Sequence, residues 1–250
     1  MLVTVDGIVI GRRNIGENSC FIDVLTDEYG VIEAVAHGVK KLTSKNAGAA
    51  LLFSYSRFCF SKSGLRYTLN SSEPKYSFHG ISSDIEYLSL AVYLADIIKD
   101  TSAPEQESKG FVRFMAITLY ELEKKRCPPE LIKSVFELHI TTMLGFAPDL
   151  RACRDCVRYE HEVMYFDIYN SCIFCGDCAD TDDTELIKLS PSLLYAMRHM
   201  VFSPVDKIYK IDIDQADLRK LSGLTEKYLL KQLDRSFRSL DYYKSVHLYQ

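Results

Sequence analysis

The chain has 250 residues, 47% of them hydrophobic, so it can bury a sizeable core and form two or three domains. It has no apolar run of about 18 or more residues, which excludes a membrane-spanning helix. The net charge of −4 is unevenly spread. Residues 153 to 183 carry two basic and eight acidic groups, whereas residues 1 to 80 carry nine and seven, and residues 184 to 250 carry eleven and eight. The acidity is therefore concentrated in one short segment, and both ends of the chain are mildly basic.

Up to residue 80, β-branched and aromatic segments alternate with glycine-containing breaks, a pattern typical of short strands. Five strands are expected, over residues 4–10, 20–25, 31–36, 52–60 and 65–69. Tight turns at 27–30 and 62–64 would join neighbouring strands, as in a small antiparallel barrel of the oligonucleotide/oligosaccharide-binding (OB) type. Strand count alone leaves a small β-sandwich or an SH3-like barrel open.

After residue 80 the apolar residues recur at helical spacing, so the expected fold class is α+β and multidomain: a five-stranded barrel followed by an α-helical domain. Ser83 and Glu86 predict a capping box for a helix whose apolar stripe begins at Ile85 and includes Val92. Further helices are expected over residues 111–122, 130–145, 191–201 and 229–240.

Five of the eight cysteines lie in one short segment, as Cys153-Arg154-Asp155-Cys156 and Cys172-Ile173-Phe174-Cys175-Gly176-Asp177-Cys178. A CxxC turn directs two thiolates at one centre, and two such turns supply the four sulfurs that tetrahedral Zn²⁺ prefers. Four protein ligands leave no position for water or substrate, so the predicted zinc is structural. Cys153 and Cys156 would open the site. Cys172 with Cys175, or Cys175 with Cys178, would complete it, and we favour the second pair.

Other interpretations of the cysteine segment are an iron–sulfur cluster, a mononuclear iron, disulfides or free thiols. The Cys-Pro that usually follows an iron–sulfur run is absent. His161 could replace a cysteine as ligand, but four better-spaced thiolates are already present. Residues 1–6 lack a basic stretch followed by an apolar core, so no secretory signal is visible. The isolated cysteines lie in apolar surroundings, and together these features indicate a reducing cytoplasm.

No GxSxG, HExxH, Walker or GxGxxG motif occurs, and the six histidines are scattered, which favours a binding protein over an enzyme. The barrel segment instead offers basic residues beside strand ends, interleaved with aromatic residues. A positive groove with aromatic faces is how barrels of this type hold single strands. The alternative is an ordinary solvated face with core aromatics. The aromatic residues are Tyr55, Phe58, Phe60 and Tyr67.

Several segments, taken together and in this order, resemble the RecO family of bacterial recombination mediator proteins. The N-terminal ones are Gly-Glu-Asn-Ser at 16–19, Leu-Thr-Asp-Glu-Tyr-Gly at 25–30 and Ala-His-Gly-Val-Lys-Lys-Leu-Thr-Ser-Lys at 36–45. Leu-Gly-Phe-Ala-Pro-Asp-Leu at 144–150, leading into Cys153, is similar to the family's entry into its zinc module. Phe166 and the pair Arg238-Ser239 continue the similarity, which spans nearly the whole chain.

The resemblance implies an OB barrel over residues 1–80, a helical domain over 81–150 and 184–250, and a zinc module over 151–183. It implies a non-enzymatic role in recombinational repair, with binding of single- and double-stranded DNA and annealing of strands coated with single-stranded DNA-binding protein. A RecR-type partner would help such a protein load the strand-exchange recombinase. The family pattern has a glycine pair where Ser171 and Cys172 stand, which supports Cys175 and Cys178 as ligands. It has a basic residue where His37 stands, so we expect weaker DNA binding here.

The residues expected to contact DNA are Arg12, Arg13, Lys40, Lys41, Lys45, Arg57 and Arg66. Lys124, Lys125 and Arg126, at a helix end, would receive an acidic peptide or complement the helix dipole, and the dipole is the simpler reading. Two other functions stay open: a protein–protein adaptor with little DNA affinity, and a metal-dependent enzyme, which would need an open coordination position.

Overall fold

The computed structural model describes residues 1–41, 43–180 and 185–247. The chain forms two compact units: Met1–Arg126 together with Phe237–Gln250, and Cys127–Ser236. We call them unit 1 and unit 2. Among the described residues, no helix is both long and apolar enough to cross a membrane.

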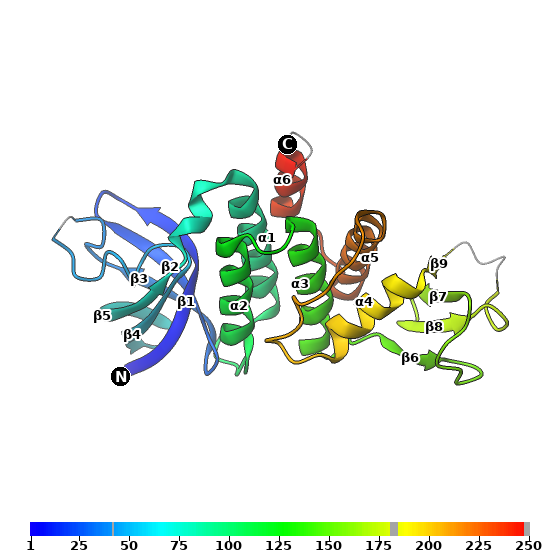
Figure 1. The fold of residues 1–250 in the computed structure, drawn as a ribbon. Helices are drawn as coiled ribbons and strands as arrows, with labels where there is room; N and C mark the ends of the chain where they lie inside the picture. The colour runs from blue at the N-terminus through cyan, green and yellow to red at the C-terminus, as the bar shows by residue number, and fades with distance from the viewer. Residues whose placement is uncertain (42, 181–184, 248–250) are drawn as a thin grey trace. The chain divides into compact units, whose positions relative to one another are not determined.

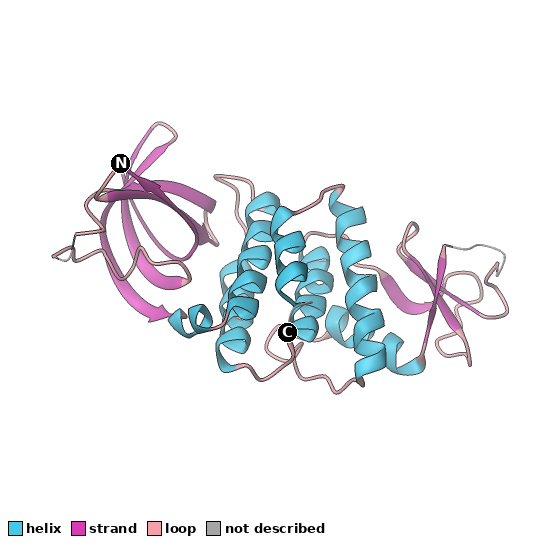
Figure 2. Ribbon diagram, turned by 90° about the horizontal axis from the view of Figure 1, so that it is seen from above, coloured by secondary structure: helices cyan, strands magenta, loops and turns pink. Residues whose placement is uncertain are grey.

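Unit 1 begins with a closed five-stranded barrel, seen in Figure 1 and, from above, in Figure 2. Its strands are β1 (Leu2–Ile15), β2 (Ser19–Thr26), β3 (Gly30–Ala36), β4 (Ser54–Ser63) and β5 (Arg66–Ser77), in the order β1-β2-β3-β5-β4. The expected OB-type barrel is confirmed. Four strand pairs are antiparallel, but β3 and β5 are parallel and pair only at Ala34 with Tyr67 and Val35 with Thr68. The barrel is therefore not wholly antiparallel.

The barrel core contains three of the four aromatic residues for which the sequence left two roles open, stacking on bases or packing in the core. Phe58 and Phe60 are fully buried and stack with ring centroids 5.6 Å apart. Tyr67 is 6% exposed and meets Phe60 edge-on. The stacking hypothesis is wrong for these residues because barrel closure turns them inward, where they pack as core. Only Tyr55 is half-buried, with the Lys75 ammonium 5.2 Å from its ring centroid.

A bulge in β1 brings that strand close to a buried carboxylate. The register of β1 with β2 shifts between Val9 and Gly11. A Cβ on Gly11 would lie 2.4 Å from Oδ2 of Asp23, a β2 residue that is only 2% exposed. The Lys99 ammonium, from the first long helix, donates to the same oxygen. Glycine is needed at position 11 because only it leaves room for this ion pair.

The helices of unit 1 are η1 (His79–Ser83), α1 (Ile85–Thr101), α2 (Phe111–Lys124) and α6 (Arg238–His247). Asp84 caps α1, because its carboxylate accepts from the Glu86 N–H at 3.0 Å. The expected capping box from Ser83 is wrong, since that hydroxyl donates to the Gly80 carbonyl inside η1. Ile85, expected in the buried stripe, is 49% exposed.

Unit 2 contains α3 (Pro129–Met143), α4 (Pro191–Phe202) and α5 (Gln215–Leu233). The single helix expected over residues 229–240 is two helices. Asp234, with φ of 50°, ends α5 in a left-handed conformation, and α6 starts at Arg238. A residue with a left-handed backbone conformation cannot continue a right-handed helix, which explains the break. The remaining strands of unit 2 hold the cysteine segment.

Candidate metal centre and nucleic-acid interface

A small four-stranded sheet, which the sequence did not predict, positions the cysteines. It consists of β6 (Asp149–Cys153), β7 (Met164–Asp167), β8 (Cys172–Cys175) and β9 (Leu186–Leu189), in the order β6-β8-β7-β9. Cys153 ends β6 and Cys175 ends β8, and these two strands are neighbours. Each CxxC turn thus begins at the end of one of two adjacent strands.

The four cysteine sulfurs form a group that can hold a metal ion. The Sγ atoms of Cys153, Cys156, Cys175 and Cys178 all lie within 4.8 Å of one another. Those of Cys156 and Cys175 are 3.5 Å apart. Zn–S bonds of about 2.3 Å in a tetrahedron place sulfurs roughly 3.8 Å apart, so the donor set fits Zn²⁺.

The backbone of the turns prepares one sulfur for metal binding. Burial opposes ionisation of Cys153, but hydrogen bonds from backbone N–H groups, including those of Cys156 and Cys175, lower its pKa to about 6. The thiolate is the metal-binding form, and one is therefore present at neutral pH. Contacts with the sulfurs of Cys175 and Cys156 raise the pKa of Cys178 to about 12. Four thiolates together need a cation to offset their mutual repulsion, which a divalent metal would supply.

Cys172 and His161 lie outside this group of four. The Cys172 sulfur is buried, which raises its pKa, and Nη1 of Arg154 lies 3.9 Å from it. His161 Nδ1 lies 3.0 Å from the Val163 carbonyl oxygen. Its ring packs on Gly176, where a Cβ would lie 3.0 Å from the ring. Of the two pairings left open by the sequence, the structure brings together the one that uses Cys178.

The structure gathers only some of the barrel cations expected to contact DNA. The backbone N–H of Lys40 donates to the Asn18 carbonyl, and its Nζ donates to the Gly16 carbonyl, both at 3.2 Å. The loop with Lys40 and Lys41 therefore lies beside the β1–β2 turn, next to Arg12 and Arg13 at the end of β1. The others are spread over the barrel: Lys45 lies towards β5, Arg57 is on β4 and Arg66 starts β5.

Two of these cations already form ion pairs with neighbouring carboxylates. Nε of Arg57 lies 2.9 Å from Oδ1 of Asp6, which also holds Lys75. Arg57 and Lys75 together lower the pKa of Asp6, although burial opposes the shift. Arg13 pairs with Glu33. These two arginines must leave or share a carboxylate to reach a phosphate, whereas Lys41, Lys45 and Arg66 extend from exposed positions.

The outer face of the barrel has a groove that the sequence reasoning missed. It has a volume of about 720 Å³, and it is lined by residues of β2, β3, the β4–β5 turn, the start of β5 and residues 104–105. Phe21 lies on β2 between buried Cys20 and Ile22, so it points outward into the groove. The Arg13 guanidinium lies 5.2 Å from its ring centroid. OB folds bind oligonucleotides on this strand 2–3 face. Phe21 stands in an apolar run at residues 20–22, so only the rule that successive strand side chains point to opposite faces could have indicated its outward ring.

These features define a class of protein: an OB-type barrel joined to a helical region that contains a four-cysteine metal site. Two family models cover almost all of the chain. Residues 1–78 match Recombination protein O N terminal, and residues 82–241 match Recombination protein O C terminal. The chain therefore belongs to the RecO family.

Proteins named DNA repair protein RecO are similar to this chain along nearly their whole length. The one from Acetivibrio thermocellus is 28% identical over 240 residues, covering 96% of this chain and 95% of the relative. The one from Alkaliphilus metalliredigens is 26% identical and covers 98% and 100%. The one from Caldicellulosiruptor saccharolyticus is 25% identical and covers 96% and 97%.

Proposed function

We propose that this chain is a DNA repair and recombination mediator that binds single- and double-stranded DNA, anneals complementary strands and assists loading of the strand-exchange recombinase. Family membership over both halves of the chain carries the proposal. The outer barrel groove, whose lining includes the rings of Phe21 and Tyr29 and the cation Arg66, supports it, although Glu33 and Glu105 also line it. The protein acts by binding, without catalytic turnover. Its proposed partners are a RecR-type protein and single-stranded DNA-binding protein, in the bacterial cytoplasm.

The proposed DNA path on the barrel crosses the Phe21 groove. Bases stack on the Phe21 ring, and phosphates bind the cations at the β1–β2 turn, because single-stranded DNA is held by stacking and charge together. The proposed phosphate contacts are Arg12, Arg13, Lys40 and Lys41, with Lys45 and Arg66 further along the barrel. Arg57 contributes least, because it is engaged with Asp6 on another face.

We also propose that Cys153, Cys156, Cys175 and Cys178 hold a structural Zn²⁺. The ion would join the two turns and neutralise the thiolates, with all four positions taken by protein. The sheet would then be stable only with metal. The proposed domains are the barrel (1–80), the two parts of the helical domain (81–150 and 184–250) and the zinc module (151–183).

A salt titration of single-stranded DNA binding tests the proposal. Lys40→Glu/Lys41→Glu should weaken binding and reduce the slope of log K against log salt by about 1.4, since each single-strand phosphate contact contributes about 0.7. Lys109→Glu/Lys220→Glu is the matched control, because both side chains are exposed, at 82% and 68%, and the change in net charge is the same. Equal slopes in the two variants would contradict the proposed barrel site.

An adaptor function is the second candidate, and the pairing of barrel cations favours it. Arg13 and Arg57 are both neutralised by carboxylates, and the net charge is −4. An adaptor would bind a repair partner tightly and show no DNA affinity at low salt. Phe21→Ala separates the two functions, because it should weaken single-strand binding by roughly 10-fold if the ring stacks on a base. If the chain is an adaptor, wild type does not bind single-stranded DNA, so Phe21→Ala has no binding to weaken.

A further inference from the structure

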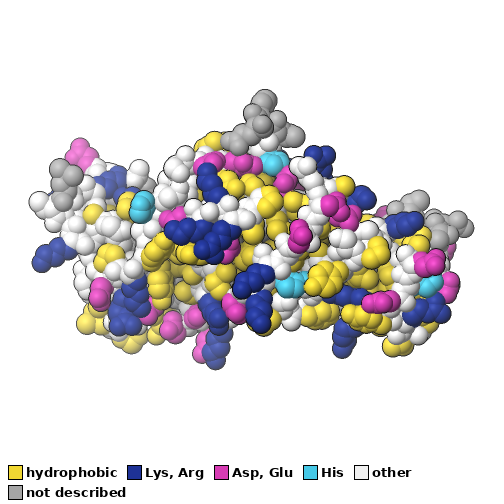
Figure 3. All heavy atoms as spheres, viewed as in Figure 1, with side chains coloured by type: hydrophobic (Ala, Val, Ile, Leu, Met, Phe, Trp, Pro, Cys, Tyr) yellow, Lys and Arg dark blue, Asp and Glu magenta, His cyan; other side chains and the backbone are white. Residues whose placement is uncertain are grey.

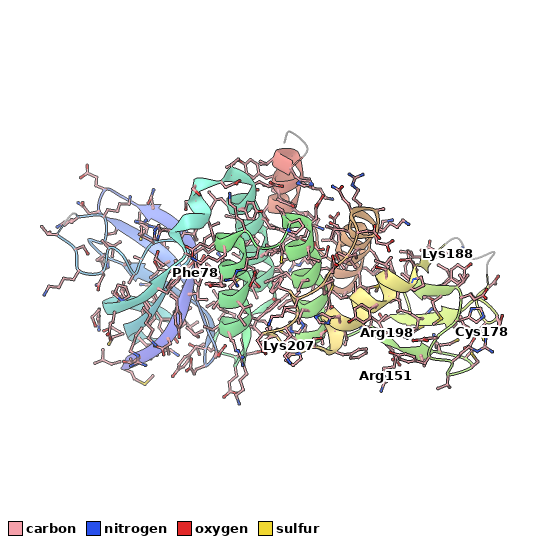
Figure 4. All side chains as sticks on the ribbon, in the orientation of Figure 1. Phe78, Arg151, Cys178, Lys188, Arg198 and Lys207 are labelled. Atoms are coloured by element: carbon pink, nitrogen blue, oxygen red, sulfur yellow. The ribbon has the colours of Figure 1, made fainter. Side chains whose placement is uncertain are left out.

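The four cysteines of the candidate metal centre are not equally shielded from solvent. Cys153 and Cys175 are 2% and 0% exposed, and Cys178, which Figure 4 labels, is half-buried. Cys156 is exposed. On the face seen in Figure 3, charged side chains of both signs lie over the part of unit 2 that holds β6–β9. A small dissolved oxidant can therefore reach the Cys156 sulfur more easily than the two buried sulfurs.

A buried sulfur lies next to the exposed one. The Sγ atoms of Cys156 and Cys175 are 3.5 Å apart. A disulfide bond is about 2.05 Å long, so these two sulfurs need to approach by only about 1.5 Å to form one. Cys172, the fifth cysteine of the segment, lies outside the group of four, with Nη1 of Arg154 3.9 Å from its sulfur. The geometry therefore favours Cys175 over Cys172 as the partner of Cys156.

The residue after Cys156 holds the first CxxC turn in a strained backbone conformation. Val157 has φ of 59°, in the left-handed region. This conformation is unfavourable for any residue with a Cβ, and more so for a β-branched one. The Val157 side chain is 75% exposed, so packing does little to hold it there. Its N–H donates to the Cys153 carbonyl at 2.9 Å, which closes the turn between the two ligands. A turn of this kind relaxes once its two sulfurs no longer share an ion.

We propose that Cys156 is an oxidation site, and that hydrogen peroxide converts Cys156 and Cys175 into a disulfide. The Cys156 thiolate attacks the peroxide, which gives a sulfenic acid and a hydroxide ion. The Cys175 thiolate then attacks the sulfenic sulfur, so that the S–S bond forms and a second hydroxide ion leaves. The peroxide gains two electrons, and the two thiolates together lose two.

The disulfide removes two of the four metal ligands, so the cysteine group no longer holds an ion tightly. The turn at Val157 relaxes and the β6–β9 sheet opens, because the strands lose the link between their turns. Thiol reductants reverse the disulfide, which makes the oxidised form a reversible modification. The inference goes beyond the proposed function and rests on the proposed metal site alone.

Treatment of the unmodified, zinc-loaded chain with hydrogen peroxide tests the inference directly. A chromogenic chelator records the released zinc, and peptide mapping without reduction identifies the disulfide. We expect a crosslink between Cys156 and Cys175 to form at the rate at which zinc appears, and a thiol reductant to restore zinc binding. Zinc release without this crosslink, or a first crosslink that uses Cys172, would overturn the inference and leave the metal site standing. A chain that binds no zinc would overturn both.

Histidine variants test whether exposure selects the oxidised ligand. Cys156→His keeps a zinc ligand, since sites of three cysteines and one histidine are common, but it removes the exposed sulfur. It should retain its zinc through a peroxide treatment that releases most of the zinc from wild type. Cys178→His is the matched control, because it makes the same exchange at a half-buried ligand and leaves Cys156 in place. It should release zinc as fast as wild type, and equal resistance of the two variants would refute Cys156 as the residue attacked.

Val157→Gly tests the strained turn with every cysteine in place. Glycine adopts the left-handed conformation freely, so this variant should lose zinc to a competing chelator roughly 3-fold more slowly than wild type. Val157→Ala is the matched control, because it shortens the same exposed side chain but keeps the Cβ, and it should gain less. Hydrogen exchange of the β6 and β8 amides in wild type should speed up after peroxide treatment. Equal zinc loss in the two variants, or unchanged exchange after oxidation, would contradict the opening of the sheet.

Discussion

A buried lysine in unit 2 allows the cost of an unpaired buried charge to be measured. Nζ of Lys133, on α3, lies 3.0 Å from Oε1 of Glu137 and 3.0 Å from Oε2 of Glu226. The side chains of Lys133 and Glu137 are 2% and 0% exposed, and that of Glu226 is 16% exposed. Thr225 Oγ1 donates to Glu137 at 2.8 Å. One ammonium therefore compensates a carboxylate that water cannot reach.

Lys133→Met keeps most of the side-chain volume and removes that charge. Glu137 then stays buried without the cation that compensates its charge, so we expect a loss of about 3–5 kcal/mol in the free energy of unfolding. Glu226 contributes little to the loss, because it can turn to solvent. The Lys133→Met/Glu137→Leu double variant removes both charges and should recover most of the stability, since a well-packed apolar pair often replaces a buried ion pair at little cost.

Urea denaturation of the zinc-loaded chain, followed by far-UV circular dichroism, measures these differences. Hydrogen exchange of the α3 amides accompanies it, because a chain of two units need not unfold in one transition. The double-mutant cycle isolates the coupling between Lys133 and Glu137. A loss of less than about 1 kcal/mol in Lys133→Met, or a double variant no more stable than the single one, would show that Lys133 does not compensate the buried charge of Glu137.

Three further predictions concern the metal, a helix cap and the barrel. Cys175→Ser should lose tightly bound zinc in a metal-release assay, whereas Cys172→Ser should keep it. Lys125 lowers the pKa of Asp84 below the ordinary 3.8, and burial opposes this. Asp84→Ala should therefore lower the free energy of unfolding by about 1 kcal/mol at neutral pH. The difference from wild type should shrink as the pH falls below 3.8, because the wild-type Asp84 carboxylate that caps α1 becomes protonated. Gly11→Ala should lower the melting temperature through a loss of about 1–3 kcal/mol.

Features set by neighbours in the chain were predictable from the sequence. The strands follow a local alternation of apolar and polar residues, and all five were expected close to where they lie. The ligand turns follow from cysteines three apart, because a CxxC turn orients its own sulfurs. The start of α4 was also predictable, since Ser190 caps it and Pro191 opens it. Each of these depends on fewer than about ten residues of sequence.

Features that depend on distant partners were not predictable. The sequence left open whether Phe58 and Phe60 stack on bases or pack in the core, because their direction depends on barrel closure. The pairing of Arg57 with Asp6 joins residues 51 apart, so the sequence could not show that this cation is already engaged. The outward ring of Phe21 lines a groove because the β4–β5 turn, the start of β5 and residues 104–105 lie beside it. Contacts of this kind depend on register and closure, which local patterns leave open.

The sequence by itself determined the five strands, most of the helices and the four-cysteine cluster, because each is encoded in local spacing. Only the tertiary structure decided which charges and rings remain available to a ligand. Burial and pairing depend on side chains brought together from distant parts of the chain. The same cations and aromatic residues can serve as core, as ion pairs or as a binding surface, and the packing around them selects among these roles.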